Sequence, residues 1–245
     1  MIFEYRPSIV GHRGFGTGQA ASYQENSLEA FLAAAVSGAP WVELDVRRSS
    51  DGELMLWHDP VTPDGHLIQA RTAGELAAEG IALLDDVLSV LPASVGVDID
   101  VKTVIEDATA PKHQRTHALA ASLVRRYRGT RRLLVSSFDP SVVAYLKDRA
   151  AVGGEVALGL IAEARFAASP ALSAAANLGM DAVCLHIDSL RSEAGRVVEF
   201  AHRARLEVMA WSAGPAQALA LALAGVDAVC VDDIPGTQAA LAGLR

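Results

Sequence analysis

Two carboxylates share one face of a short apolar segment. Residues 41–46 read Trp-Val-Glu-Leu-Asp-Val, and the period of two in a β-strand places Glu43 and Asp45 opposite the apolar side chains. A strand that is covered on both faces is expected to be apolar nearly throughout, so two charges on one face need a chemical reason. The apolar face suits contact with helices, and the pattern therefore predicts that both carboxylates point into a barrel.

The same alternation returns in residues 97–102, where Asp98, Asp100 and Lys102 share a face. Carboxylates on neighbouring strands would lie a few ångströms apart, and they cannot all stay ionised without a counter-charge. A divalent cation with oxygen ligands supplies that charge, and Mg²⁺ or Ca²⁺ suits such a site. The alternative is internal ion pairing, for which the candidate cations are Lys102, Arg13 and Arg47.

The two cysteines are not expected to belong to this site. Cys184 and Cys230 each lie inside an apolar run, AVCLHI and AVCVDD, which predicts reduced core residues and neither a disulfide nor a metal ligand. The shortage of cysteine and histidine ligands also disfavours a closed zinc site.

Two histidines come at positions where a parallel barrel presents reactive groups. His12 ends the first apolar segment together with Arg13, and His58 ends the return that follows residues 41–46. A pair of histidines beside a metal ion suits proton transfer to and from a phosphodiester. The remaining histidines are expected to have structural roles: His66, His113, His117, His186 and His202.

Short apolar runs that alternate with alanine-rich stretches predict the elements that must position these residues. The expected strands are 9–12, 42–46, 95–101, 133–137, 157–161, 182–185, 207–211 and 228–231. The expected helices are 26–37, 84–91, 114–127, 140–149, 166–178, 190–204, 215–224 and 236–243. Eight βα units in 245 residues predict a (β/α)₈ TIM barrel.

The longest break in this rhythm follows the second strand. The segment GELMLWHDP, residues 52–60, is expected to form a hairpin return, and the polar segment 61–80 a small excursion that caps the active site. The glycines of 14–18 do not follow the G-x-G-x-x-G spacing, so dinucleotide binding is not expected. No linker or low-complexity tail interrupts the sequence, which predicts a single domain over residues 1–245.

Composition excludes some classes of function. The chain has 51% hydrophobic residues and a formal net charge of -8, which argues against a nucleic-acid-binding surface. The sequence contains no run of about 18 or more apolar residues, so no membrane span is predicted. The first residues lack the features of a secretory signal. We therefore expect no membrane insertion and a cytoplasmic location. The alanine-rich helices are compatible with either a monomer or a homo-oligomer.

Four short motifs connect the chain to a known family. They are G-H-R-G at 11–14, E-N-S at 25–27, V-E-L-D-V at 42–46 and W-H-D at 57–59. In this order and spacing they resemble the opening signature of the glycerophosphodiester phosphodiesterases, which are TIM-barrel enzymes. Later matches extend the resemblance over the barrel: D-V-K at 100–102, V-S-S-F at 135–138, V-M-A-W at 208–211 and G-V-D-A-V-C-V-D-D-I-P at 225–235.

The resemblance implies roles for individual residues. It implies that His12 and His58 form the acid–base pair, and that Arg13 and Lys102 contact phosphate. The metal ligands implied are Glu43, Asp45 and Asp100, with Glu25 shaping the site and Trp211 lining the substrate pocket. The implied reaction is metal-dependent hydrolysis of a glycerophosphodiester, a small molecule, to an alcohol and glycerol 3-phosphate.

Three positions depart from the family pattern. Asp100 replaces the usual glutamate ligand, as in the related sphingomyelinase D branch, and is one methylene shorter. Ser27 replaces a common threonine, and W-S-A-G at 211–214 replaces a frequent W-T-V-N. The last two changes bear on the specificity for the alcohol.

The sequence leaves several alternatives open. The nucleophile is either water or the glycerol 2-hydroxyl, and either histidine could be the base, with His12 favoured. The rival enzyme function is a lipid-directed phosphodiesterase of the lysophospholipase D or sphingomyelinase D type. A barrel that binds phosphate esters without turning them over, or a metal-dependent isomerase or aldolase, would use the same fold.

Overall fold

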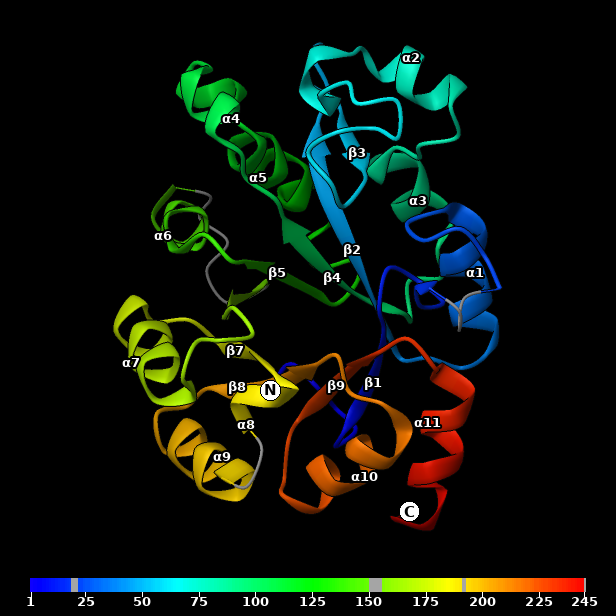
Figure 1. Cartoon of the computed structure of the whole chain (residues 1–245). Helices are drawn as coiled ribbons and strands as arrows, with labels where there is room; N and C mark the ends of the chain where they lie inside the picture. Colours follow the sequence, from blue (N-terminus) through cyan, green and yellow to red (C-terminus); the bar gives the residue numbers. More distant parts are fainter. Residues whose placement is uncertain (19–21, 150–155, 191–192, 245) are drawn as a thin grey trace.

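The computed structural model describes residues 1–18, 22–149, 156–190 and 193–244. Its parallel strands follow one another around a closed barrel, with helices on the outside (Figure 1). They are β1 (Ser8–Gly11), β2 (Trp41–Arg48), β4 (Gly96–Val101), β5 (Leu133–Ser137), β6 (Ala157–Ile161), β7 (Ala182–His186), β8 (Glu207–Trp211) and β9 (Ala228–Val231). The barrel closes because β1 pairs with β2 on one side, Val10 opposite Trp41, and with β9 on the other, Val10 opposite Cys230. The predicted (β/α)₈ TIM barrel is confirmed.

Helices connect consecutive parallel strands and cover the outside of the barrel. They are α1 (Leu28–Val36), α3 (Leu84–Val90), α4 (Ile105–Thr109), α5 (Thr116–Tyr127), α6 (Pro140–Arg149), α7 (Ala168–Leu178), α8 (Ile187–Leu190), α9 (Ala194–Arg203), α10 (Pro215–Leu223) and α11 (Ile234–Leu241). Short 3₁₀ helices also occur, among them η2 (Ile68–Ala70), η3 (Lys112–Gln114) and η5 (Ala242–Leu244). The helix expected over 190–204 begins later, at Ala194, and part of that range, 191–192, lies outside the described residues.

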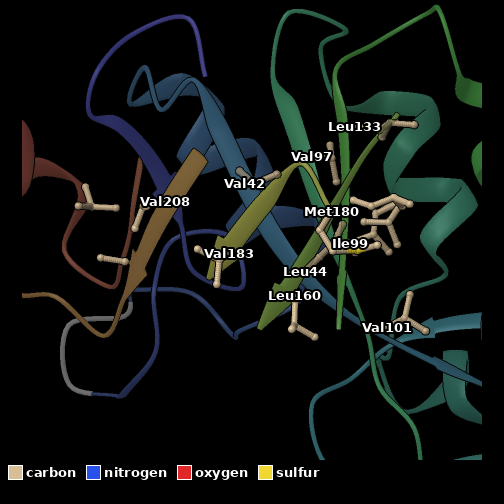
Figure 2. Close-up of a cluster of buried hydrophobic side chains, with 14 of the residues drawn as sticks. Val42, Leu44, Val97, Ile99, Val101, Leu133, Leu160, Met180, Val183 and Val208 are labelled. Atoms are coloured by element: carbon tan, nitrogen blue, oxygen red, sulfur yellow. The ribbon is translucent and has the colours of Figure 1, made fainter. Parts of the chain in front are cut away.

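Two apolar layers hold the barrel together. The outer layer joins strands to helices and includes Val42, Leu44, Val97 and Ile99, which Figure 2 shows among its buried side chains. These are the residues that alternate with the carboxylates, so the period-two interpretation of both segments is confirmed. Burial of this face against the helices fixes the register, because a slip of one residue would turn every carboxylate outward.

The inner layer fills the amino-terminal end of the barrel. It includes Phe3, Val10, Trp41 and Leu134, and the Phe3 and Trp41 rings meet edge to face with their centroids 5.2 Å apart. Gly96 is required beside them, because a Cβ there would lie 2.4 Å from the Trp41 ring. The barrel is therefore packed at this end, and only its carboxyl-terminal end can open into a site.

The predicted hairpin return after β2 is the strand β3 (Leu54–Leu56), which pairs antiparallel with β2 through Val46 and Leu56. The polar excursion that follows contains η2 and the helix α2 (Ala73–Ala78). Its apolar side chains pack with β3 in a separate small cluster that includes Met55, Ile68 and Leu76.

Candidate active site

Four carboxylates lie on the inner faces of β2 and β4, with Asp45 and Asp100 nearer the carboxyl ends than Glu43 and Asp98. The register pairs Glu43 with Asp98 and Asp45 with Asp100, so the two strands present them in two successive layers. All four are at most 6% exposed. Ligand oxygens of Glu43, Asp45 and Asp100 lie within 4.8 Å of one another, which makes this trio a candidate cation site. The structure thus brings together the residues that sequence reasoning proposed as metal ligands.

Two cations neutralise part of this charge. Lys102 Nζ lies 2.9 Å from Asp45 Oδ1 and also pairs with Asp100, while Arg13 Nε lies 3.0 Å from Asp45 Oδ2. The internal ion pairing considered as an alternative to a metal is therefore present for Asp45 and Asp100. Arg47 plays a different part, because its guanidinium donates to the backbone carbonyl of His58.

Oxygen atoms remain that the protein does not pair. Asp100 Oδ1 and Asp98 Oδ2 are buried and have no hydrogen-bond partner among the described residues. Burial and the Asp45 charge raise the pKa of Glu43 to about 7, and burial raises the pKa of Asp100 to about 6. Asp100 Oδ1, with the oxygens of Glu43 and Asp45 close to it, provides the oxygen donors that Mg²⁺ or Ca²⁺ prefers, so these three residues fit a hard divalent cation.

Asn26 holds Asp45 in place from the segment before α1. Its Nδ2 donates to Asp45 Oδ2 at 2.8 Å, and its Oδ1 accepts from Asp45 N at 3.1 Å. Asn26 has φ 57°, a left-handed conformation that asparagine tolerates better than most residues. Sequence reasoning noted the E-N-S motif but assigned no role to its asparagine. The available signal was the position of Asn26, a polar residue between a turn and the start of a helix.

Arg13 is fixed by the residue before Asn26 and by the carboxylate layer. Arg13 Nη1 donates to Glu25 Oε1 at 2.7 Å, and Arg13 N donates to Glu43 Oε2 at 2.9 Å. Glu25 therefore contacts the guanidinium but does not line the cavity described below. This arrangement presents a positive side chain beside the carboxylates.

His12 is oriented by a residue that sequence reasoning did not select. His12 Nδ1 lies 2.8 Å from Asp232 Oδ1, and Thr17 N donates to the same oxygen at 2.9 Å. Gly16 allows this close approach, since a Cβ there would lie 2.1 Å from the Asp232 carbonyl oxygen. Burial lowers the pKa of His12, but Asp232 and Glu43 together raise it by more, so it lies above the ordinary value. The V-D-D motif contained the signal, because the first of its two aspartates, Asp232, directly follows β9.

His58 faces the same carboxylates from the hairpin return. Its Nδ1 lies 2.8 Å from Asp59 Oδ1, and Trp57 N donates to Asp45 O at 3.1 Å, which ties the return to β2. Burial, helped by the nearby Arg13, lowers the pKa of His58. The two histidines therefore have pKa values displaced in opposite directions.

A cavity of about 200 Å³ joins these groups. Its lining residues are His12, Arg13, Glu43, Asp45, His58, Asp98, Asp100, Lys102, Phe138, Ile161, Cys184, Met209, Trp211, Ser212 and Cys230. The Trp211 ring packs edge to face against Phe138 and His186, with centroids 5.9 and 4.5 Å apart. The expected cap segment 61–80 contributes none of these lining residues, because its apolar side chains pack against β3.

The other predicted features have the following outcomes. Cys184 and Cys230 are buried free thiols, and burial raises both pKa values well above the ordinary range, so the expectation of reduced core residues is confirmed.

His12 and His58 are the histidines that line the cavity among the described residues. His117 instead packs on Tyr145, with ring centroids 4.5 Å apart. Among the described residues, no helix combines the length and the apolar character needed to cross a membrane.

Solved structures share this architecture. A phosphodiesterase of Oleispira antarctica, determined in complex with the product sn-glycerol-3-phosphate, is 24% identical, with a TM-score of 0.78 and 97% of each chain covered. The glycerophosphodiester phosphodiesterase of Thermotoga maritima is 20% identical, with a TM-score of 0.76, over 99% of this chain and 100% of that one. At these identities the similarity establishes a shared fold.

Sequence comparison is more specific. A stretch of 55 residues is 40% identical to the glycerophosphocholine phosphodiesterase GDE1 of Eremothecium gossypii, and it spans 21% of this chain and 4% of that much longer protein. The profile of the glycerophosphoryl diester phosphodiesterase family matches residues 12–235, which extend from His12 past Asp232. Because this match runs through nearly the whole barrel, the chain belongs to the glycerophosphoryl diester phosphodiesterase family.

Proposed function

We propose that this protein hydrolyses small glycerophosphodiesters to an alcohol and glycerol 3-phosphate, with a divalent cation and a histidine pair. The observation that carries the proposal is that His12 and His58 line the same cavity of about 200 Å³ as the carboxylates Glu43, Asp45 and Asp100. Membership of the family supports the reaction class. The product-bound structure of the Oleispira antarctica phosphodiesterase supports glycerol 3-phosphate as the product.

His12 is proposed as the general base. Because Nδ1 faces the Asp232 carboxylate at 2.8 Å, the ring proton stays on Nδ1 and Nε2 is free to accept a proton. Nε2 would take that proton from the nucleophile as its oxygen bonds to phosphorus. The nucleophile is water, or the glycerol 2-hydroxyl through a cyclic phosphate that water then opens.

His58 is proposed as the general acid. Protonated His58 would give its proton to the alcohol oxygen as the bond between that oxygen and phosphorus breaks. Burial lowers the pKa of His58, which makes its protonated form a stronger acid but a smaller fraction of the enzyme at neutral pH. Arg13 and Lys102 are the cations that would hold the phosphate, and Trp211 would form one wall for the substrate.

Glu43, Asp45 and Asp100 would hold the cation, Mg²⁺ or Ca²⁺. When bound, it would neutralise charge on a non-bridging phosphate oxygen as phosphorus is attacked. Two observations support this: Asn26 holds Asp45 in place, and Asp100 Oδ1 has no hydrogen-bond partner in the part of the chain that the structure describes.

The decisive experiment is an assay of the purified chain on glycerophosphocholine, glycerophosphoethanolamine and lysophosphatidylcholine, each with EDTA, Mg²⁺ or Ca²⁺. Metal-dependent release of choline or ethanolamine together with glycerol 3-phosphate would establish the function. Absence of turnover on every substrate and with every metal would refute it and favour a barrel that only binds phosphate esters.

One observation keeps a lipid-directed phosphodiesterase, of the lysophospholipase D or sphingomyelinase D type, as the second candidate. Large apolar side chains are exposed in segments that follow strands at the open end of the barrel: Tyr23 at 43%, Ile105 at 78% and Phe166 at 51%. Such side chains could contact an acyl chain or a micelle. Turnover of lysophosphatidylcholine without turnover of the small glycerophosphodiesters would select this candidate.

The cellular setting is also part of the proposal. We place the protein in the cytoplasm, as one domain over residues 1–245. We expect no nucleic-acid partner, because the net charge is -8. Either a monomer or a homo-oligomer is compatible with this function. Fractionation of cells that express the chain, and size-exclusion chromatography with light scattering, would test location and assembly.

A further inference from the structure

Asp98 lies in the same layer as Glu43, one layer below Asp45 and Asp100, and is not one of the three residues of the candidate cation site. Its partner in the register is Glu43, whereas Asp100, two residues later on β4, pairs with Asp45 nearer the open end. Asp98 is 1% exposed and lines the cavity. It therefore places a carboxyl group on the floor of the proposed active site.

One of the two Asp98 oxygens has a partner and the other does not. Ser136 Oγ donates to Asp98 Oδ1 at 2.7 Å, which fixes the orientation of the carboxyl group. Asp98 Oδ2 is buried and has no hydrogen-bond partner among the described residues. A buried acceptor that is left unpaired is costly, so a donor from within the cavity is expected to meet it.

The other residues on the cavity floor are poor hydrogen-bond donors, so we assign the donor that meets Asp98 Oδ2 to a ligand. They are Ile161, Cys184, Met209 and Cys230, whose side chains are apolar or weakly polar. The cavity of about 200 Å³ has room for several groups of the size of a water molecule, about 30 Å³ each. A polar end of a substrate whose phosphate is held by Arg13 and Lys102 can therefore extend to the floor.

We propose that Asp98 Oδ2 accepts a hydrogen bond from a hydroxyl of the glycerol moiety, and that Asp98 with Ser136 forms a hydroxyl-binding subsite on the cavity floor. This inference rests on the proposed function and deepens it by naming what selects a glycerol ester. A site that hydrogen-bonds a substrate hydroxyl rejects analogues that lack it, because the buried acceptor then stays unpaired. Asp98 is thus a specificity-determining residue and takes no part in the proton transfers.

The test compares two substrates within each variant. Glycerophosphoethanolamine carries the glycerol hydroxyls, and bis(4-nitrophenyl) phosphate is a phosphodiester without them. For Asp98→Leu we expect kcat/KM on glycerophosphoethanolamine to fall about tenfold, the upper end of the usual effect of losing one hydrogen bond. On bis(4-nitrophenyl) phosphate, which makes no such hydroxyl contact, the loss should be smaller, so the ratio of the two kcat/KM values should fall about tenfold.

Asp98→Asn is the conservative variant. Its amide can still hydrogen-bond both Ser136 and a hydroxyl, so we expect it to retain most of the preference for the glycerol ester. Inhibition gives a second readout that tolerates low turnover. Glycerol 3-phosphate should inhibit the wild type more strongly than ethyl phosphate, and this difference should shrink in Asp98→Leu, or in Asp98→Ala if the leucine variant does not fold.

Two outcomes would overturn the subsite. Equal losses on both substrates would mean that Asp98 acts through the cation or the fold, and unchanged kcat/KM on both would mean that it has no contact with the hydroxyl. A wild type that hydrolyses bis(4-nitrophenyl) phosphate but no glycerophosphodiester would refute the proposed function first, and the subsite with it. The two failures are therefore distinguishable.

Discussion

His12 and Asp232 are 220 positions apart in the sequence, and their side chains meet at 2.8 Å between Nδ1 and Oδ1. The contact exists because β1 and β9 are neighbours in the closed barrel, with Gly11 opposite Val231. Each residue directly follows one of these two strands, so the carboxylate and the imidazole come to the same edge. The pair gives the proposed base a defined tautomer.

Removal of the Asp232 charge should slow turnover. We expect Asp232→Asn to lower kcat by about tenfold or more with little change in KM, because His12 loses its preferred tautomer. Asp233→Asn is the matched control, since Asp233 caps α11 by accepting from Gly236 N and asparagine caps equally well. A normal kcat in purified, folded Asp232→Asn would contradict the role of Asp232.

The pH dependence should report the same pair. The pKa of His12 is raised above its ordinary value, and a base must be unprotonated, so kcat/KM should fall as the pH drops through that pKa. Asp232→Asn removes a raising interaction and should move this acidic limb to lower pH. The groups that act on His12 are Glu43, Arg13 and Asp232. An acidic limb that stays in place in the variant would argue that another group is titrating.

Each histidine of the cavity should be needed for the reaction. We expect His12→Ala and His58→Ala each to reduce kcat about 10²-fold or more, which is the usual contribution of general acid–base catalysis. His66→Ala is the control, since the His66 side chain is 67% exposed and pairs with Asp64 away from the cavity. Steady-state kinetics with circular dichroism on all three variants would check this. Near-normal turnover in either cavity variant would remove that histidine from the mechanism.

Cation binding should stabilise the fold as well as support turnover. A cation that binds the native state alone, at about a hundredfold excess over its Kd, adds about 2.7 kcal/mol to the free energy of unfolding. We expect thermal melts of EDTA-treated protein to shift upward with Mg²⁺ or Ca²⁺, and Glu43→Gln to reduce the shift. The melting temperature of the wild type staying constant with both metals would contradict a site at Glu43, Asp45 and Asp100.

Asn26 should matter for both stability and activity. We expect Asn26→Ala to lower the free energy of unfolding by about 1–3 kcal/mol, because Asp45 N and Asp45 Oδ2 lose buried partners. Turnover should fall as well, since Asp45 is then held less firmly. Ser27→Ala separates the two effects: it removes the cap of α1, at a cost of about 1 kcal/mol, and leaves Asp45 untouched. Urea unfolding and kcat, measured on both variants, would show whether turnover falls with the loss of the Asp45 contacts or with the loss of stability alone.

Local pattern was enough to predict most of the elements. The strand expected over 42–46 is longer in the structure, Trp41–Arg48, because β3 folds back and pairs with Arg47 and Arg48. Such an extension depends on a partner strand and not on the residues themselves, so their apolar period could not indicate it. The expected cap over 61–80 depended in the same way on which surface its apolar side chains would find, and that surface is β3.

The sequence by itself determined which face of each strand carries the carboxylates. The alternation in 41–46 and 97–102 required Glu43, Asp45, Asp98 and Asp100 to lie inside any barrel that buried the residues between them, because side chains of a strand alternate. Only the tertiary structure decided the partners: Asn26 holds Asp45, Asp232 orients His12, and one Asp98 oxygen has no partner within the described residues. These contacts join distant segments through barrel closure and side-chain geometry, which no local period encodes.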